Sequence, residues 1–107
     1  MNSFQWKKET FGEYIRKLRE KAGMPLRKLA AALDLDQSTL SKIERNERRP
    51  TKEMVPILAQ VFNLKYDELM IRFLSDKIMY ELADEDLGLE ALKVAEETIE
   101  YKRKVKR

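Results

Sequence analysis

The sequence predicts an all-α protein, and three observations carry that prediction. The 107-residue chain contains only 3 Gly and 3 Pro, so few positions interrupt a helix. Its apolar residues recur at spacings of three and four, which is the pattern of amphipathic helices. Residues that favour helix starts or helix ends flank most of these segments. We therefore expect a helical bundle rather than a disordered chain or a β-sandwich.

The first predicted helix covers residues 11–22. Thr10 and Glu13 match the capping box, in which the two side chains each accept the other residue's backbone N–H. Apolar residues follow at helical spacing, and Gly23 is a typical residue to end the helix.

Two short helices are predicted next. Pro25 suits the start of the second helix, which ends near Asp34. Asp36 suits the N-cap of the third helix, which runs to about Asn46. A turn of three or four residues between two short helices is the spacing of a helix-turn-helix.

Two further helices complete the predicted bundle. Thr51 is expected to cap the fourth helix, whose apolar positions run to Phe62. Pro56 then lies about five residues inside it, which predicts a bend or a later start. The fifth helix is expected to begin at about Lys65, and its apolar pattern extends as far as Leu82.

A last helix is predicted after the acidic segment Asp84–Asp86, with basic residues near its end that complement the helix dipole. Residues 74–105 carry an apolar stripe that is either extra core or a dimer interface, and we favour the dimer because a helical hairpin added to a small bundle has little surface of its own chain on which to bury both of its apolar faces. The dimer candidates are Leu74, Ile78, Leu82, Leu89, Leu92 and Ile99. The predicted organisation is an arm (1–9), a domain (10–73) and a C-terminal extension (74–107).

The net charge of +3 conceals an uneven distribution. Residues 1–52 carry 13 basic and 7 acidic side chains, whereas residues 81–97 carry 1 basic and 7 acidic. A polyanion is therefore expected to bind the N-terminal half, if it binds at all.

The absence of His and Cys excludes disulfides, thiol nucleophiles, imidazole bases and the usual zinc ligands. The acids of residues 81–97 lack EF-hand spacing and are read as a solvated face, so we expect no metal, no cofactor and no enzyme activity. Metal-dependent turnover that requires Asp84 or Asp86 would revive the enzyme hypothesis. With no apolar run near the roughly 20 residues of a membrane span, we expect a cytoplasmic protein that does not bind membranes.

The third predicted helix has a polar face with few acids and several hydrogen-bonding side chains. Short hydroxyl and amide side chains can reach base edges in the DNA major groove, and positive charges can pair with the flanking phosphates. Glu44 is a poor choice on such a helix unless it has another role. The polar positions are Gln37, Ser38, Thr39, Ser41, Lys42 and Arg45.

Residues 26–50 resemble the helix-turn-helix of the Xre family, which includes the lambda-repressor-like and Cro-like proteins. The family pattern is found at Leu29-Ala30, at Thr39–Asn46 and at Arg48–Pro50, and the resemblance extends over about residues 10–73. It implies a five-helix lambda-repressor-like bundle that binds double-stranded DNA. The expected function is a transcriptional regulator of prokaryotic or phage type that acts at the nucleoid, as a homodimeric repressor of a pseudo-palindromic operator.

The resemblance also assigns roles to individual residues. It places base reading at Gln37, Ser38 and Lys42, and it pairs Arg19 with Glu44 as a structural ion pair. The residues expected to flank the bases or contact phosphates are Arg27, Lys28, Thr39, Ser41, Arg45, Arg48 and Arg49. For Arg48 and Arg49, a solvated loop is the alternative.

Two positions depart from the family pattern. Pro25-Leu26 replaces the usual Ser or Thr followed by Gln, which removes an expected phosphate contact. Asn46 replaces a Gly, and Asn is the residue after Gly that best tolerates positive φ. The resemblance leaves open an antitoxin or accessory module that binds another protein. Phe4 and Trp6 in the arm are expected to anchor on the bundle or on a partner, with DNA contact as the alternative.

Overall fold

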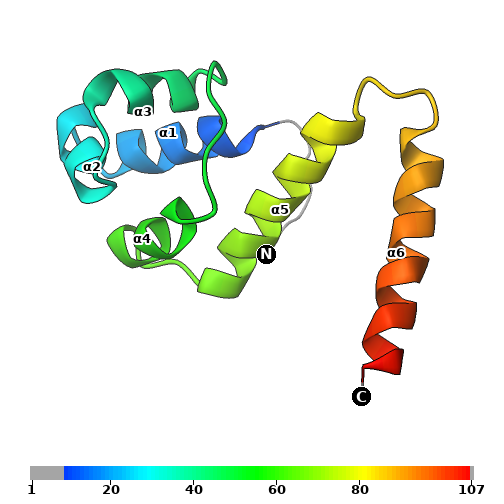
Figure 1. The fold of residues 1–107 in the computed structure, drawn as a ribbon. Coiled ribbons are helices and arrows are strands. Elements are labelled where there is room, and N and C mark those ends of the chain that lie inside the picture. Colours follow the sequence, from blue (N-terminus) through cyan, green and yellow to red (C-terminus); the bar gives the residue numbers. More distant parts are fainter. Residues whose placement is uncertain (1–8, 107) are drawn as a thin grey trace. The chain divides into compact units, whose positions relative to one another are not determined.

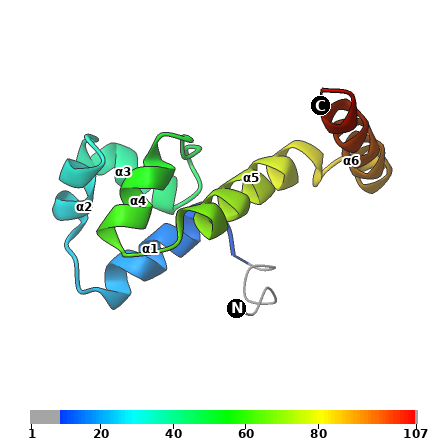
Figure 2. The same ribbon diagram turned by 90° about the horizontal axis from the view of Figure 1, so that it is seen from below.

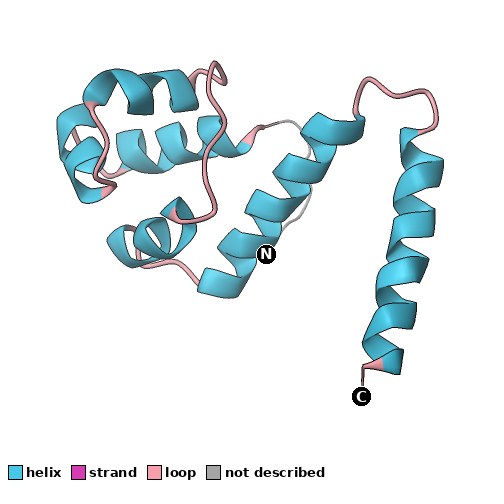
Figure 3. Ribbon diagram, in the orientation of Figure 1, coloured by secondary structure: helices cyan, strands magenta, loops and turns pink. Residues whose placement is uncertain are grey.

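Six α-helices make up the part of the chain that the computed structural model describes, residues 9–106 (Figure 1). No strand occurs among these residues (Figure 3). The chain divides into two compact units, the first ending at Asp76 and the second beginning at Lys77. The helices are α1 (Phe11–Lys21), α2 (Leu26–Ala32), α3 (Gln37–Glu44), α4 (Met54–Val61), α5 (Tyr66–Leu82) and α6 (Gly88–Val105).

The first four helices end in the same way. Gly23, Asp34, Asn46 and Asn63 follow them with φ between 52° and 64°, in the left-handed region. In each case the next residue donates its N–H to a carbonyl five residues earlier, at 2.8–3.0 Å, which satisfies a helix-end carbonyl. Three of these next residues also pack against the core, namely Met24, Leu35 and Leu64.

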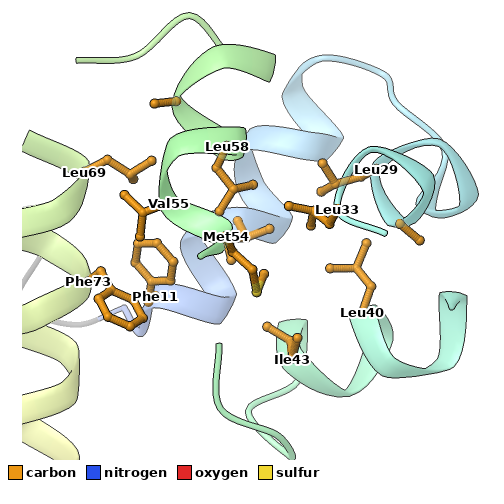
Figure 4. Close-up of a cluster of buried hydrophobic side chains, with 13 residues drawn as sticks. Phe11, Leu29, Leu33, Leu40, Ile43, Met54, Val55, Leu58, Leu69 and Phe73 are labelled. Carbon is orange, nitrogen blue, oxygen red and sulfur yellow. The ribbon is translucent and has the colours of Figure 1, made fainter. Parts of the chain in front are cut away.

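The core of the first unit is built by α1 to α5 (Figure 4). The rings of Phe11 and Phe73 meet edge to face, with centroids 5.5 Å apart and an interplanar angle of 80°, so α1 and α5 are joined at the core. The core side chains are Phe11, Ile15, Leu29, Ala30, Leu33, Leu40, Ile43, Met54, Val55, Leu58, Ala59, Leu69 and Phe73.

The helix-turn-helix lies at one end of the first unit. Helix α2 is on the far side of this unit from α5 in both ribbon views (Figure 2). Helix α3 contacts both α1 and α2. Its approach to α1 requires Gly12, because a Cβ at that position would lie 2.1 Å from the carbonyl oxygen of Ile43. The glycine therefore sets how closely α3 seats on α1.

Helix α4 begins later than the sequence suggests, so the predicted cap at Thr51 is wrong. The N-cap is Glu53, and residues 51–53 form a turn in which Met54 N–H donates to Thr51 O at 3.1 Å. Pro56 is consequently the third residue of the helix, in the first turn, where a backbone N–H has no helical partner. The late start, rather than a bend, accommodates the proline.

In the second unit, Asp84–Asp86 do not open the last helix as expected. They lie in the turn before α6, whose N-cap is Leu87. Gly88 N–H donates to Glu85 O at 3.0 Å, and a Cβ on Gly88 would lie 2.6 Å from Leu82 O. Because Asp84–Asp86 form this tight turn, α6 begins only at Gly88. The basic residues Lys102, Arg103 and Lys104 do lie in the last turn of α6.

Candidate nucleic-acid interface

Helix α3 presents a polar face from its first turn onward. Leu40, Ile43 and Glu44 are buried, while Gln37, Ser38 and Lys42 are exposed. Thr39 and Ser41 are half-buried between these two sides, and Arg45 follows the helix as an exposed C-cap. The three residues assigned to base reading are therefore brought together on one accessible surface of a helix that the core holds on its other side.

Asp36 holds the first turn of α3 in place. Its carboxylate accepts the Thr39 N–H at 2.7 Å and the Ser38 hydroxyl at 3.2 Å. The backbone hydrogen bond from Thr39 lowers the pKa of Asp36 below its ordinary value, because it stabilises the charged form. With its proton directed to Asp36, Ser38 presents a hydroxyl oxygen that accepts hydrogen bonds.

Arg19 and Glu44 form a part-buried salt bridge between α1 and α3. Arg19 Nε and Nη2 donate to the two Glu44 carboxylate oxygens at 2.8 and 3.0 Å, and Nη1 donates to Met24 O at 3.0 Å. The hydrogen bond to Glu44 raises the pKa of Arg19. Glu44 is only 4% exposed, so its negative charge is withdrawn from the polar face of α3.

The second residue after α3, Asn46, is tied back to the start of α1. Asn46 has φ of 64°, and its Oδ1 accepts a hydrogen bond from the Thr10 hydroxyl at 2.7 Å. Thr10 also accepts the Glu13 N–H and completes the capping box with that residue. A glycine at position 46 would permit the same φ and lose this contact, so the departure from the family pattern adds a link.

The loop after α3 carries three arginines in different settings. Arg45 donates to Ser41 O at 3.3 Å and lies 3.5 Å from Glu47 in an exposed ion pair. Arg48 is exposed. Arg49 Nη2 pairs with the carboxylate of Asp76 on α5, and the arginine side chain stays 40% exposed.

Asp76 is a site residue that the sequence reasoning missed. One of its carboxylate oxygens accepts a hydrogen bond from Arg49 Nη2, and the other accepts the Phe11 N–H at 2.9 Å. This buried side chain therefore joins α5, the loop after α3 and the start of α1. Its signal in the sequence is its place in the apolar stripe of α5, three residues after the core residue Phe73.

A second buried charge on α5 was also missed. Arg72 stacks over the Tyr14 ring at 3.8 Å and lies 3.5 Å from Glu9, which is also paired with Lys17 at 3.3 Å. Burial lowers the pKa of Arg72 and raises the pKa of Tyr14. These contacts hold the residues before α1 against α5 and do not reach α3.

The start of α2 presents two more basic side chains. Arg27 and Lys28 are exposed in its first turn. Pro25 is the N-cap and makes no side-chain cap hydrogen bond, and Leu26 has no side-chain amide with which to make the phosphate contact of the family pattern.

The remaining predictions concern the dimer candidates, the N-terminal arm, metal binding and membrane spans. Of the dimer candidates, Leu82 is half-buried, whereas Leu74, Ile78, Leu89, Leu92 and Ile99 are between 38% and 82% exposed. Phe4 and Trp6 lie outside the described residues. Among residues 9–106 no three acidic side chains gather as a metal site would require, and none of these helices has the length and apolarity to cross a bilayer.

Known proteins share both the sequence pattern and the fold of this chain. The chain matches the helix-turn-helix family over residues 15–69, which include α2, α3 and α4 in full. It is similar in fold to the clp gene regulator ClgR from C. glutamicum, with a TM-score of 0.50 and 23% identity over 61% of this chain and 84% of that one. No curated protein sequence matches it. With a family match over just over half of its length, the chain belongs to the helix-turn-helix family of DNA-binding transcriptional regulators, that of the Xre and lambda-repressor-like domains.

Proposed function

We propose that this protein is a sequence-specific regulator that reads double-stranded DNA by placing α3 in the major groove. The observation that carries the proposal is the polar face of α3, on which Gln37, Ser38 and Lys42 are exposed while Glu44 is buried against Arg19. The charge distribution supports it, because the N-terminal half that contains α3 carries the excess of basic residues.

Each of the three residues has a base partner that fits its chemistry. The Gln37 amide can donate to and accept from adenine N7 and N6, and Lys42 can donate to guanine O6 and N7. Ser38 offers an acceptor, which suits the exocyclic amino group of cytosine or adenine. A well-formed contact of this kind discriminates against the wrong base by about 1–3 kcal/mol.

The basic residues around α3 are proposed to contact phosphates. Arg27 and Lys28 lie at the start of α2, and Arg45 and Arg48 lie at and after the end of α3, so they flank the reading face on both sides. Arg49 is held by Asp76 and keeps part of its side chain exposed, which suits a phosphate contact of defined position. Thr39 and Ser41 are proposed to lie beside the bases.

We further propose that the regulator is a homodimer that represses transcription. Two copies related by a two-fold axis would present two α3 helices to successive major grooves, which requires a pseudo-palindromic operator with half-sites about 10 bp apart. Four exposed apolar residues support a dimer through the C-terminal part of the chain, namely Leu74, Ile78, Leu92 and Ile99.

Selection of bound duplexes from a random DNA pool tests the proposal. We expect an enriched inverted repeat, with an affinity that falls as salt rises, at a log–log slope of about −0.9 per phosphate neutralised. Gln37→Ala and Lys42→Ala should each relax preference at particular base pairs, whereas Arg48→Ala should weaken binding to all sequences alike. Lys65→Ala removes an exposed charge at the start of α5 and serves as the control.

Several outcomes would count against the proposal. Absence of any enriched sequence would favour a protein-interaction module such as an antitoxin. Uniform weakening by all three α3-region variants would mean that α3 is not the reading helix. For the repressor role, the selected repeat is placed in a reporter promoter, and expression that rises when the protein is produced would contradict it.

A further inference from the structure

Helix α6 carries an apolar half that the described residues of its own unit, 77–106, leave uncovered. Gly88 is the buried residue of this helix, and Leu89 to Val105 are all exposed. At about 100° per residue, most of its apolar side chains share one half of the helix, and most charged ones occupy the other. The apolar half holds Ala91, Leu92, Val94, Ala95, Ile99, Tyr101 and Val105. An 18-residue helix draws most of its stability from packing such a face against another surface.

The charges of the same segment are separated along its length. Asp84, Glu85 and Asp86 stand immediately before α6, and Glu90 lies in its first turn. The opposite end is basic, with Lys102, Arg103 and Lys104 in the last turn and Lys106 after it. Helical geometry puts Lys102 and Lys106 in line with the apolar half, so this surface is apolar in its middle and basic at its C-terminal end.

We propose that α6 is the self-association element of the protein, and that it pairs antiparallel with α6 of a second copy. The antiparallel direction places the acidic segment before each α6 beside the basic end of the other, so both ends of the pair are neutralised. Parallel pairing would set Lys102 beside Lys102 and Lys106 beside Lys106. The small side chains of Ala91 and Ala95 allow the two helices to approach closely.

This pairing deepens the dimer part of the proposed function and rests on it. If the two 18-residue helices overlap along their full length, the two-fold axis passes between residues 96 and 97. Ala95 then lies beside Thr98 of the second copy and only about 4.5 Å along the axis from its own counterpart. Val105 lies beside Gly88 of the second copy and about 25 Å along the axis from its counterpart. Leu89, on the charged half, stays outside the interface.

Sedimentation equilibrium of the full chain tests self-association. We expect a dimer whose dissociation constant rises about 30-fold or more in Ile99→Glu, because this change puts a charge into the apolar half. Leu89→Glu places the same charge on the same helix outside that half and should leave the dimer unchanged. Equal effects of the two substitutions, or no effect of either, would overturn the assignment of this face.

Disulfide formation tests the direction of pairing, and the absence of native Cys makes single substitutions unambiguous. A disulfide needs Cα atoms within about 7 Å. Under mild oxidation, Ala95→Cys should therefore form a covalent dimer and Val105→Cys should not. Covalent dimers from both variants would mean parallel pairing, and none from Ala95→Cys would also overturn the proposal.

Charge exchange tests the role of the two ends. Lys102→Glu with Lys106→Glu should weaken the dimer, as should Glu85→Lys with Asp86→Lys, and all four changes together should restore it. Failure of the combined variant to recover would contradict the antiparallel contact. A monomeric wild type would overturn both this inference and the proposed dimer, whereas DNA selection by that monomer would leave the assignment of α3 intact.

Discussion

The two carboxylate oxygens of Glu44 accept hydrogen bonds from two nitrogens of Arg19, at 2.8 and 3.0 Å, across the contact between α1 and α3. This pair solves an electrostatic problem for a helix proposed to face DNA. A carboxylate on α3 would repel DNA phosphates if it faced solvent, and it would be costly to bury without a partner. Arg19 permits its burial and also binds the carbonyl of Met24 in the turn before α2. One side chain thus positions both helices of the helix-turn-helix on α1.

Arg19→Ala should destabilise the protein by about 3 kcal/mol, because it leaves the buried Glu44 carboxylate without its arginine. Chemical denaturation measures the change. Arg16→Ala is the matched control, since it removes an exposed arginine paired with Glu20 on the same helix and should cost at most about 0.5 kcal/mol. Equal midpoints for the two variants would contradict the structural role. Base preference should not change selectively in Arg19→Ala.

Gly12→Ala should be among the most damaging single-methyl changes in the chain. The added Cβ would meet the backbone carbonyl of Ile43 at 2.1 Å, and α1 and α3 would have to separate. We expect a loss of about 3 kcal/mol or a failure to fold. Gly23→Ala provides the comparison, because it has open space around it and pays only for its φ of 64°, about 1–2 kcal/mol. A thermal melt of Gly12→Ala at or above that of Gly23→Ala would refute the close approach.

Asp36→Ala should lower the melting temperature, whereas Asp36→Asn should preserve it, because Asn also caps a helix N-terminus. The pKa of Asp36 is lowered in the folded protein. Its stabilising effect is therefore fully present above the ordinary value of 3.8 and is lost as the pH falls through the lowered folded pKa. Wild type and Asp36→Asn should therefore be similarly stable at neutral pH, and wild type should become the less stable of the two only in this acidic range. A difference that is constant down to strongly acidic pH would contradict the charged cap.

Asp76→Ala should destabilise the protein by about 2 kcal/mol, since it removes the acceptor of the buried Phe11 N–H as well as the partner of Arg49. Asp76→Asn retains a carbonyl oxygen for Phe11 and should lose less. Ser75→Ala, at the exposed neighbouring position, should be close to neutral. Denaturant midpoints rank the three variants, and an alanine variant as stable as Ser75→Ala would refute the anchoring role.

Much of the fold follows from local patterns. The start of α1 is predictable because Thr10 and Glu13 satisfy each other's backbone within one turn of chain. The end of α3 is likewise signalled by Asn46, which adopts the positive φ that follows a helix. The polar face of α3 comes from the spacing of its own residues. The pairing of Arg19 with Glu44 came from the family resemblance, because 25 residues separate them and no periodicity connects them.

By itself, then, the sequence determined the helical class, the order of the helices and the surface of α3 that faces outward, because these depend on interactions within a few residues. Only the tertiary structure decided that Asp76 holds both Arg49 and the Phe11 N–H, across separations of 27 and 65 residues. It also decided that α4 begins at Met54, where the turn formed by residues 51–53 places Pro56 in the first turn. A buried charge or a delayed helix start depends on which distant groups supply hydrogen bonds. That information exists only when the chain is packed.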